Sequence, residues 1–200
     1  MSINLTKGQR ISLKKEAPGL TRLMCGLGWD IAQLPPGKVK RFFTYVPDFD
    51  LDAAVVCLDP NSHIRDKTDL IYFGNLQHQS GAITHLGDNL TGAGDGDDEE
   101  IIVNLAQVPN YIEKLVFTVN IYSCLTRKQD FSQVKNAFVR LVDLGNQREI
   151  ARYNLSGDAY HNMTGMVMAE IYRKDQEWKM AAIGNGFRVS NLEELVTLFT

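Results

Sequence analysis

The residues best suited to chemistry are the carboxylates of one glycine-rich stretch, GDNLTGAGDGDDEEI, at residues 87–101. Six acids fall within thirteen residues: Asp88, Asp95, Asp97, Asp98, Glu99 and Glu100. Hard oxygen ligands suit Ca²⁺, which takes about six to eight of them. The interleaved glycines reach positive φ at no steric cost, which lets backbone carbonyls turn towards an ion. The stretch therefore predicts a cation cage, with Ca²⁺ preferred over Mg²⁺.

The charge around this stretch is strongly one-sided. From Thr68 to Glu113 there are eight acids and no Lys or Arg, whereas the rest of the chain holds 16 acids and 21 bases. Crowded carboxylates repel one another and raise some carboxyl pKa values unless a cation neutralises them. The alternative is a solvated acidic loop, which is a common surface connection. We favour the cage, because six acids without a basic partner exceed what solubility requires.

Other metal patterns match less well. The twelve residues from Asp88 to Glu99 have the length of an EF-hand loop, but Leu90 and Gly92 stand where Asp or Asn is needed. His78 and His85 lie outside the acidic stretch, and no Cys is near it in sequence. The zinc and iron patterns are therefore not matched.

More distant acids could complete the cage. In FDLDAAVVCLD, residues 49–59, Asp50 and Asp52 share one face of an extended chain that continues into a buried strand, although acids can also simply mark a strand end. GLGWD, residues 26–30, offers Asp30 beside Trp29, which we expect in the core. The candidate ligands are Asp88, Asp95, Asp97, Asp98 and Glu99 first, then Asp52, Asp50 and Asp30. Alternation along the following strand should point Glu100 away from Glu99.

Most of the chain alternates between apolar and polar residues. This pattern runs through residues 69–74, 99–105, 114–122, 136–144, 148–155, 165–173 and 177–184. Seven or more such strands separated by turns predict an all-β, two-sheet β-sandwich. Residues 190–200 predict a short C-terminal helix with Ser190 as N-cap. With 44% hydrophobic residues, we expect one domain over residues 1–200.

Several functional classes are disfavoured. No apolar run approaches 18 residues and no leader is visible at Met1, so we expect a cytoplasmic protein without a transmembrane segment. The basic and aromatic run RFFTYV, after a turn at residues 35–37, is more typical of an edge strand or partner contact than of a nucleic-acid site. Motifs of serine hydrolases, zinc proteases and P-loop enzymes are absent from the sequence, and His161 lies in a turn-like segment.

The three cysteines do not form a recognisable redox motif. Cys25, Cys57 and Cys124 are odd in number and lack C-x-x-C spacing. We expect them to be small buried residues in a reducing compartment. A thiol-based reaction is the alternative, although reactive thiols usually have an exposed, electropositive setting.

Five stretches resemble, in order, the TerD family of tellurite-resistance and stress proteins. They are KGQRISLKKEAPGL, GLGWD, FDLDAAVVCLD, the acidic stretch, which follows the family pattern GDN-x-TG-x-GDGDDE, and EIARYNL with EWKMAAIG. Residues 33–47 depart from the family pattern. The resemblance implies a β-sandwich with two Ca²⁺ sites, a cytoplasmic location and a role in the response to tellurite and other stress. It also implies partners among other stress proteins, including a membrane-embedded one from the same gene cluster, and no established reaction.

These observations lead to one preferred function and two alternatives. We favour a Ca²⁺-binding stress-response module that acts by binding a partner, with the ion ordering the acidic stretch into a recognition surface. The first alternative is a Ca²⁺-dependent module that binds a membrane surface. The second is a metal- or thiol-dependent enzyme, for which the sequence offers no base to activate water.

Overall fold

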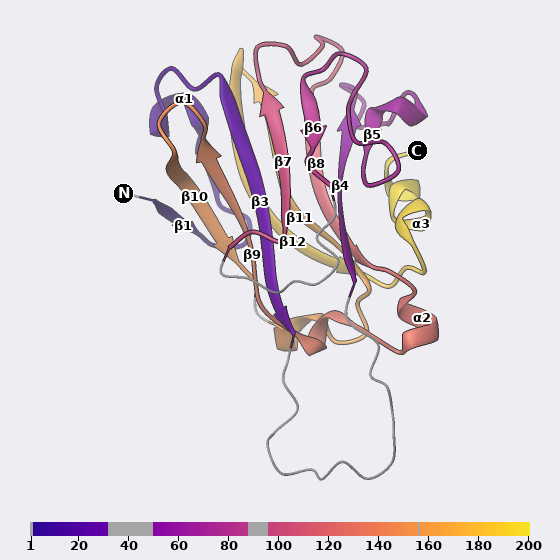
Figure 1. The fold of residues 1–200 in the computed structure, drawn as a ribbon. Helices are drawn as coiled ribbons and strands as arrows, with labels where there is room; N and C mark the ends of the chain where they lie inside the picture. Colours follow the sequence, from indigo (N-terminus) through magenta and orange to yellow (C-terminus); the bar gives the residue numbers. More distant parts are fainter. Residues whose placement is uncertain (1, 32–49, 88–95, 156) are drawn as a thin grey trace.

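Two six-stranded sheets pack face to face in the computed structural model, which describes residues 2–31, 50–87, 96–155 and 157–200 (Figure 1). Sheet A has the order β1-β10-β9-β3-β7-β6 and sheet B the order β2-β12-β11-β8-β4-β5. Strands β1 and β10 pair in parallel, and the other pairings between these strands are antiparallel. The predicted two-sheet β-sandwich is confirmed.

The strands follow the alternating segments of the sequence. They are β1 (Ile3–Leu5), β2 (Arg10–Ser12), β3 (Arg22–Ile31), β4 (Leu51–Leu58), β5 (Leu70–Ile71), β6 (Ile83–His85), β7 (Glu99–Asn104), β8 (Lys114–Ile121), β9 (Val134–Asp143), β10 (Arg148–Asn154), β11 (Gly165–Lys174) and β12 (Glu177–Phe187). The α-helices are α1 (Leu13–Glu16), α2 (Cys124–Arg127) and α3 (Leu192–Val196), and the 3₁₀ turns are η1 (Lys67–Asp69), η2 (Phe131–Gln133), η3 (Gly157–Tyr160) and η4 (Thr197–Phe199). All seven predicted segments contain or overlap a strand.

Strand β3 is the main element that alternation did not predict. It lies between β9 and β7 in sheet A and contains the whole GLGWD stretch. Its outer face carries Gly26 and Gly28, which provide no side chains to signal a strand. Trp29 belongs to the core, as expected.

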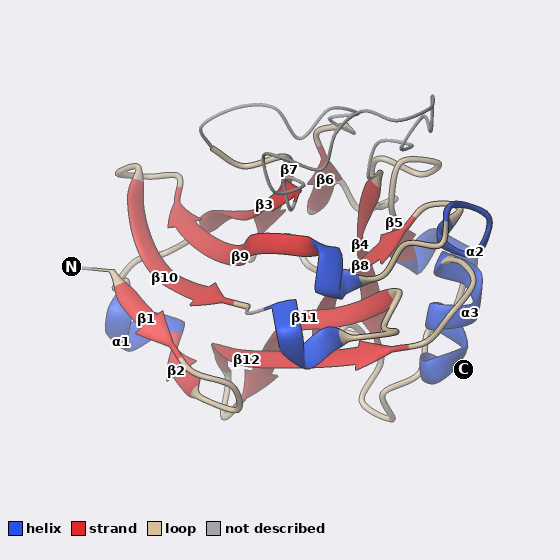
Figure 2. Cartoon of the chain, turned by 90° about the horizontal axis from the view of Figure 1, so that it is seen from below, coloured by secondary structure: helices blue, strands red, loops and turns tan. Residues whose placement is uncertain are grey.

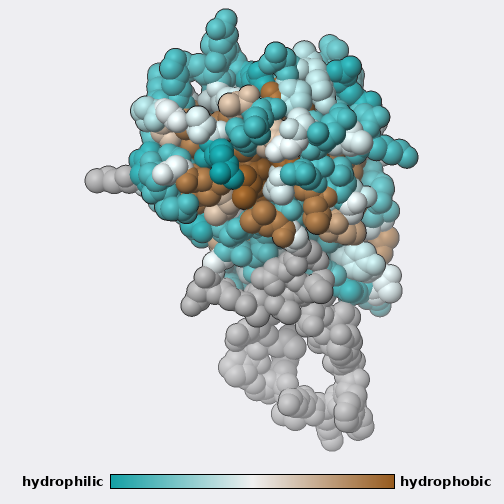
Figure 3. Space-filling view, turned by 45° about the horizontal axis from the view of Figure 1, so that its top comes forward, coloured by the Kyte–Doolittle hydropathy of each residue, from teal (hydrophilic) through white to brown (hydrophobic). Residues whose placement is uncertain are grey.

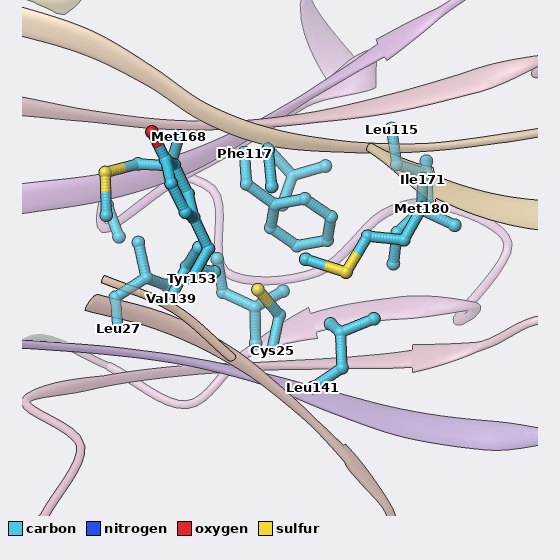
Figure 4. Packing of buried hydrophobic residues seen from close by; sticks show 14 of the residues in the cluster. Cys25, Leu27, Leu115, Phe117, Val139, Leu141, Tyr153, Met168, Ile171 and Met180 are labelled. Carbon is cyan, nitrogen blue, oxygen red and sulfur yellow. The ribbon is translucent and has the colours of Figure 1, made fainter. Parts of the chain in front are cut away.

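The main core fills the space between the sheets. Figure 4 shows side chains of β3 and β9 facing those of β8, β11 and β12, with Phe117 of β8 among them. Strand β4 is buried on both faces. Leu51, Ala53, Val55 and Cys57 join the inter-sheet core, whereas the alternate residues pack outside sheet B, partly against α3. The interior position of Phe117 makes it a sensitive test of this packing.

The C-terminal helix begins one residue later than its predicted cap implied. Asn191, not Ser190, is the N-cap of α3, and its side chain accepts a hydrogen bond from the backbone N–H of Glu194 at 2.8 Å. Ser190 instead donates its backbone N–H and hydroxyl to the Glu194 carboxylate. The predicted Ser190 cap is therefore wrong, because two adjacent residues can both cap and Asn191 has the capping geometry. Figure 2 shows α2 and α3 on the side of the molecule where β4 and β5 lie.

Two further expectations concern the segment around residues 35–46 and the absence of a membrane span. The turn at residues 35–37 and the extended run at 41–46 lie outside the described residues. Among the residues that are described, none of the helices has both the length and the apolarity needed to cross a bilayer.

Candidate functional site

Several of the candidate ligands lie at one end of the sandwich. Strand β3 ends where β7 begins, because the two strands are antiparallel with Leu27 opposite Glu99 (Figure 1). Strand β4 of the other sheet begins near the same place, since His85 contacts both Glu99 and the backbone of Ala53. The pairing of β3 with β7 therefore brings Asp30 close to Asp97 and Asp98. Asp52, at the start of β4, lies on the outer face of sheet B.

Asp30, Asp97 and Asp98 form the most crowded part of this region. Asp98 is buried, and its Oδ2 accepts the backbone N–H of Trp29 at 2.8 Å. Burial raises the pKa of the Asp98 carboxyl, and the charges of Asp30 and Asp97 raise it further, while the Trp29 hydrogen bond opposes the shift. Asp30 is exposed, and its Oδ2 accepts a hydrogen bond from Asn136 Nδ2 at 2.7 Å. A cation here would relieve the repulsion that Asp98 experiences.

Asp97 differs from its neighbours because a basic side chain holds it. Arg140 on β9 approaches it with Nε at 2.8 Å from Oδ1 and Nη2 at 2.9 Å from Oδ2. The side chain of Asp97 is fully buried in this contact. The sequence carries no signal of this contact, since 43 residues separate the two and Arg140 lies in an ordinary alternating strand segment.

Glu99 points between the sheets, as its alternation with Glu100 predicts. Its Oε2 lies 3.0 Å from His85 Nε2, which is also 3.2 Å from the carbonyl oxygen of Ala53. His85 Nδ1 accepts the backbone N–H of Gly87, so the ring proton belongs on Nε2 in the neutral imidazole. His85, set aside at first because it precedes the acidic stretch, thus links Glu99 of sheet A to β4 of sheet B.

Asp52 pairs across sheet B with Asn120, a residue that the sequence did not single out. Asn120 Nδ2 lies 3.3 Å from Asp52 Oδ2, and both side chains are buried. The Oδ1 atom of Asn120 is buried and has no hydrogen-bond partner among the residues that the structure describes. Both residues line a pocket of about 330 Å³, together with Tyr122 and Glu193. An unpaired buried carbonyl oxygen beside a carboxylate is a suitable environment for a hydrogen-bond donor or a hard cation.

Of the remaining candidate ligands, one is described and two lie outside the described residues. Asp50 precedes β4, and its Oδ2 lies 3.7 Å from Nη1 of Arg127. Asp88 and Asp95 lie outside the described residues. Within the part of the chain that is described, no three His, Cys, Asp or Glu side chains are grouped closely enough to hold a metal on their own.

The donor chemistry nevertheless fits the implied ion. Asp98, Asp30 and Asp52 supply carboxylates and Asn120 supplies an amide carbonyl, all of them oxygen ligands of the kind that Ca²⁺ uses. The raised pKa of Asp98 and the unpaired oxygen of Asn120 are two features that a bound cation would satisfy.

A second buried polar cluster surrounds Asp69, which directly precedes β5. His78 Nε2 is 3.0 Å from Asp69 Oδ1, which also accepts the hydroxyl of Tyr111 at 2.7 Å, while His78 Nδ1 is 2.7 Å from Ser80 Oγ. Asp69 and His78 are buried, and Ser80 is exposed. These contacts fix the turn from His78 to Gly81, where the Gly81 N–H bonds to the His78 carbonyl. We assign the cluster a structural role.

All three cysteines are free and buried. Burial raises the pKa of the Cys25 thiol, and the charge of Asp97 adds to this effect. Burial also raises the pKa of Cys57, with Asp69 contributing. The thiolate is the reactive form of cysteine, so this setting disfavours thiol chemistry at these two residues.

The buried thiols lead to a simple prediction. With the reagent DTNB, Cys25, Cys57 and Cys124 of the native protein should react at least about 100-fold more slowly than in denaturant, because all three are buried. At Cys25 and Cys57 the raised thiol pKa also leaves little thiolate at neutral pH. Absorbance of the released thiol product measures both rates. If any cysteine of the native protein reacts as fast as it does in the denatured chain, that thiol is accessible and the thiol-dependent enzyme becomes a candidate function again.

Comparison with known proteins gives consistent results along the chain. The family model described as the TerD domain matches residues 1–199. The chain is 48% identical over 204 residues to stress response protein SCP2 of Bacillus subtilis strain 168, covering 100% of both chains. It is 43% identical over 187 residues to tellurium resistance protein TerD of Serratia marcescens, covering 94% of this chain and 92% of that one.

Among solved structures, the fold is similar to that of a homologue of telluride resistance protein TerD from Streptomyces coelicolor A3(2). The TM-score is 0.68 at 21% identity, with 91% of this chain and 99% of that chain covered. This likeness extends to the fold alone.

Proposed function

This chain belongs to the TerD domain family, and from that membership we propose that it is a stress-response protein that contributes to resistance against tellurite and other chemical stress. The names of its relatives support the proposal, since they include stress response and tellurium resistance proteins of several bacteria. We further propose that it acts by binding rather than by catalysis, in the cytoplasm.

Calcium is the proposed cofactor. The acidic stretch, Asp98 included, would supply most ligands, together with Asp30 from β3 of sheet A and Asp52 and Asn120 from β4 and β8 of sheet B. The observation that carries this proposal is the unpaired, buried Oδ1 of Asn120 beside Asp52, near the sandwich end where Asp98 is crowded by other acids. Bound Ca²⁺ would supply charge neutralisation and coordination of these oxygens.

A binding role is also supported by the surface. The described residues expose six large hydrophobic side chains: Phe73, Leu76, Leu86, Tyr122, Leu125 and Leu198. Figure 3 shows one face on which hydrophobic residues gather among polar ones. Exposed apolar patches commonly mark contacts with other proteins. We propose other stress-resistance proteins as partners, including a membrane-embedded one.

Growth of a tellurite-sensitive bacterium tests the proposed function. Cells that express the natural chain should grow at tellurite concentrations that stop cells with an empty vector. The Asp98→Asn protein should lose this protection because a cation ligand is missing, whereas Glu100→Gln, which removes an equal charge from a residue outside the candidate ligand set, should retain it. Equal protection by Asp98→Asn at matched expression would separate resistance from the cation site, and no protection by the natural chain would remove the resistance role.

A further inference from the structure

The outer face of sheet A carries a recess that holds the side chain of Asp97. Gly26 of β3 lies opposite Arg140 of β9 on this face. A Cβ atom on Gly26 would lie 2.1 Å from Asp97 Oδ2, far closer than two atoms can approach. The absence of a side chain at Gly26 is therefore what lets the Asp97 carboxylate lie against the strand.

Arg140 is held in position for this contact by its other neighbours. Its Nη1 lies 3.4 Å from Oε2 of Glu149, so that Nε and Nη2 remain directed at Asp97. Oε2 of Glu149 also accepts a hydrogen bond from Nη1 of Arg152. The guanidinium of Arg152 lies 3.7 Å from the centre of the Phe138 ring. Phe138 in turn fills the space over Gly28, where a Cβ would lie 2.4 Å from its Cζ. The two glycines of GLG thus accommodate Asp97 and Phe138.

A two-point guanidinium–carboxylate contact is among the strongest arrangements of ionised groups. Asp97 has no exposed side-chain surface in it, while Arg140 remains partly exposed. Its negative charge is already neutralised within the protein, in contrast to Asp98, whose carboxyl faces other acids. A cation would gain little from Asp97 unless it displaced Arg140.

We propose that Gly26, Asp97 and Arg140 form a latch that fixes Asp97, two residues before β7, to sheet A, and that Asp97 is an anchor and not a cation ligand. Arg140 is then a positioning residue, because it holds the Asp97 carboxylate against β3 and so removes one carboxylate from the ligand set. The effect on cation binding rests on the proposed function, but the latch itself is independent of it.

The latch is tested without metal by a double-mutant cycle. In EDTA, Arg140→Gln should lower the melting temperature, because it leaves the Asp97 charge buried and unpaired. Adding Asp97→Asn should restore part of that loss, so that the double variant melts above Arg140→Gln alone. A double variant that melts no higher than Arg140→Gln would overturn the latch. Because no cation is present, this result holds whether or not the protein binds calcium.

Calcium titration of the same variants tests the anchor role. Asp97→Asn should bind Ca²⁺ within about threefold of the natural chain, because it removes a nearby charge but no ligand. Arg140→Gln should bind about tenfold more tightly, because it releases a carboxylate, while Arg140→Lys should stay near the natural value. Arg152→Gln is the matched control: it removes a charge beside the same Glu149 without touching Asp97, and should change affinity by less than about threefold. A loss for Asp97→Asn as large as that for Asp98→Asn would make Asp97 a ligand and overturn the proposal.

The Gly26→Ala variant tests the recess at Gly26 independently of Arg140. Its Cβ would push Asp97 out of the recess while leaving Arg140 intact. It should lower the melting temperature in EDTA and do so less when Asp97→Asn is also present. Full stability of Gly26→Ala would contradict the recess.

Discussion

The Asp98→Asn protein is expected to melt at a higher temperature than the natural chain in EDTA, and to lose most of the stabilisation that Ca²⁺ gives. Burial and neighbouring acids raise the pKa of this carboxyl, so its ionised form is less favourable in the folded state than in the unfolded state. Asparagine removes that cost and can still accept the Trp29 N–H. A gain of about 1 kcal/mol would raise the melting temperature by about 2–4 °C in a chain of this size.

The same variant should bind Ca²⁺ about 10- to 100-fold more weakly, since it loses a charged ligand. The sign of the pH dependence follows from the raised pKa. The gain in EDTA should be full above the folded-state pKa of Asp98 and should disappear as the pH falls below its unfolded value. Differential scanning calorimetry with and without Ca²⁺ measures both effects. Glu100→Gln is the control, because it removes the same charge without removing a candidate ligand. If Glu100→Gln changes the melting temperature in EDTA and the Ca²⁺ affinity as much as Asp98→Asn does, Asp98 is not a specific ligand.

The largest loss of stability is expected from Phe117→Ala. Phe117 is fully buried between the sheets, among side chains of both (Figure 4). Removing its ring leaves a cavity that the surrounding strands cannot fill, which typically costs about 3–5 kcal/mol of unfolding free energy. Urea unfolding monitored by circular dichroism gives the difference.

The matched control is Phe73→Ala, because Phe73 is 50% exposed. This change should lower the unfolding free energy by less than about 1 kcal/mol. A loss at Phe73 equal to that at Phe117 would contradict the assignment of the core to the space between the sheets.

The fold was largely predictable because most strands have one face in the core and one in solvent, which imposes alternation on the sequence. Strand β7 shows this directly, with Glu99, Ile101 and Val103 buried and their neighbours less so. Strand β3 was not predicted because Gly26 and Gly28 leave space for Asp97 and Phe138 and carry no side chains that would continue the alternating pattern. The role of these two glycines can be recognised only once the three-dimensional positions of Asp97 and Phe138 are known.

The candidate site was predictable in composition but not in arrangement. Oxygen ligands in excess indicate a cation wherever they occur, so Asp98 and Asp52 could be named from the sequence. The contacts of Arg140 with Asp97, of His85 with Glu99 and of Asn120 with Asp52 depend on strand register. Register is set by long-range pairing, which local sequence does not contain.

Calorimetric titration of the EDTA-stripped protein with Ca²⁺ tests the central claim most directly. We predict about two ions per chain at micromolar affinity or tighter, together with a rise in melting temperature that follows from linkage. The absence of both binding heat and a melting shift would contradict the cation site, and the acids would then be a solvated loop on a β-sandwich of the TerD family.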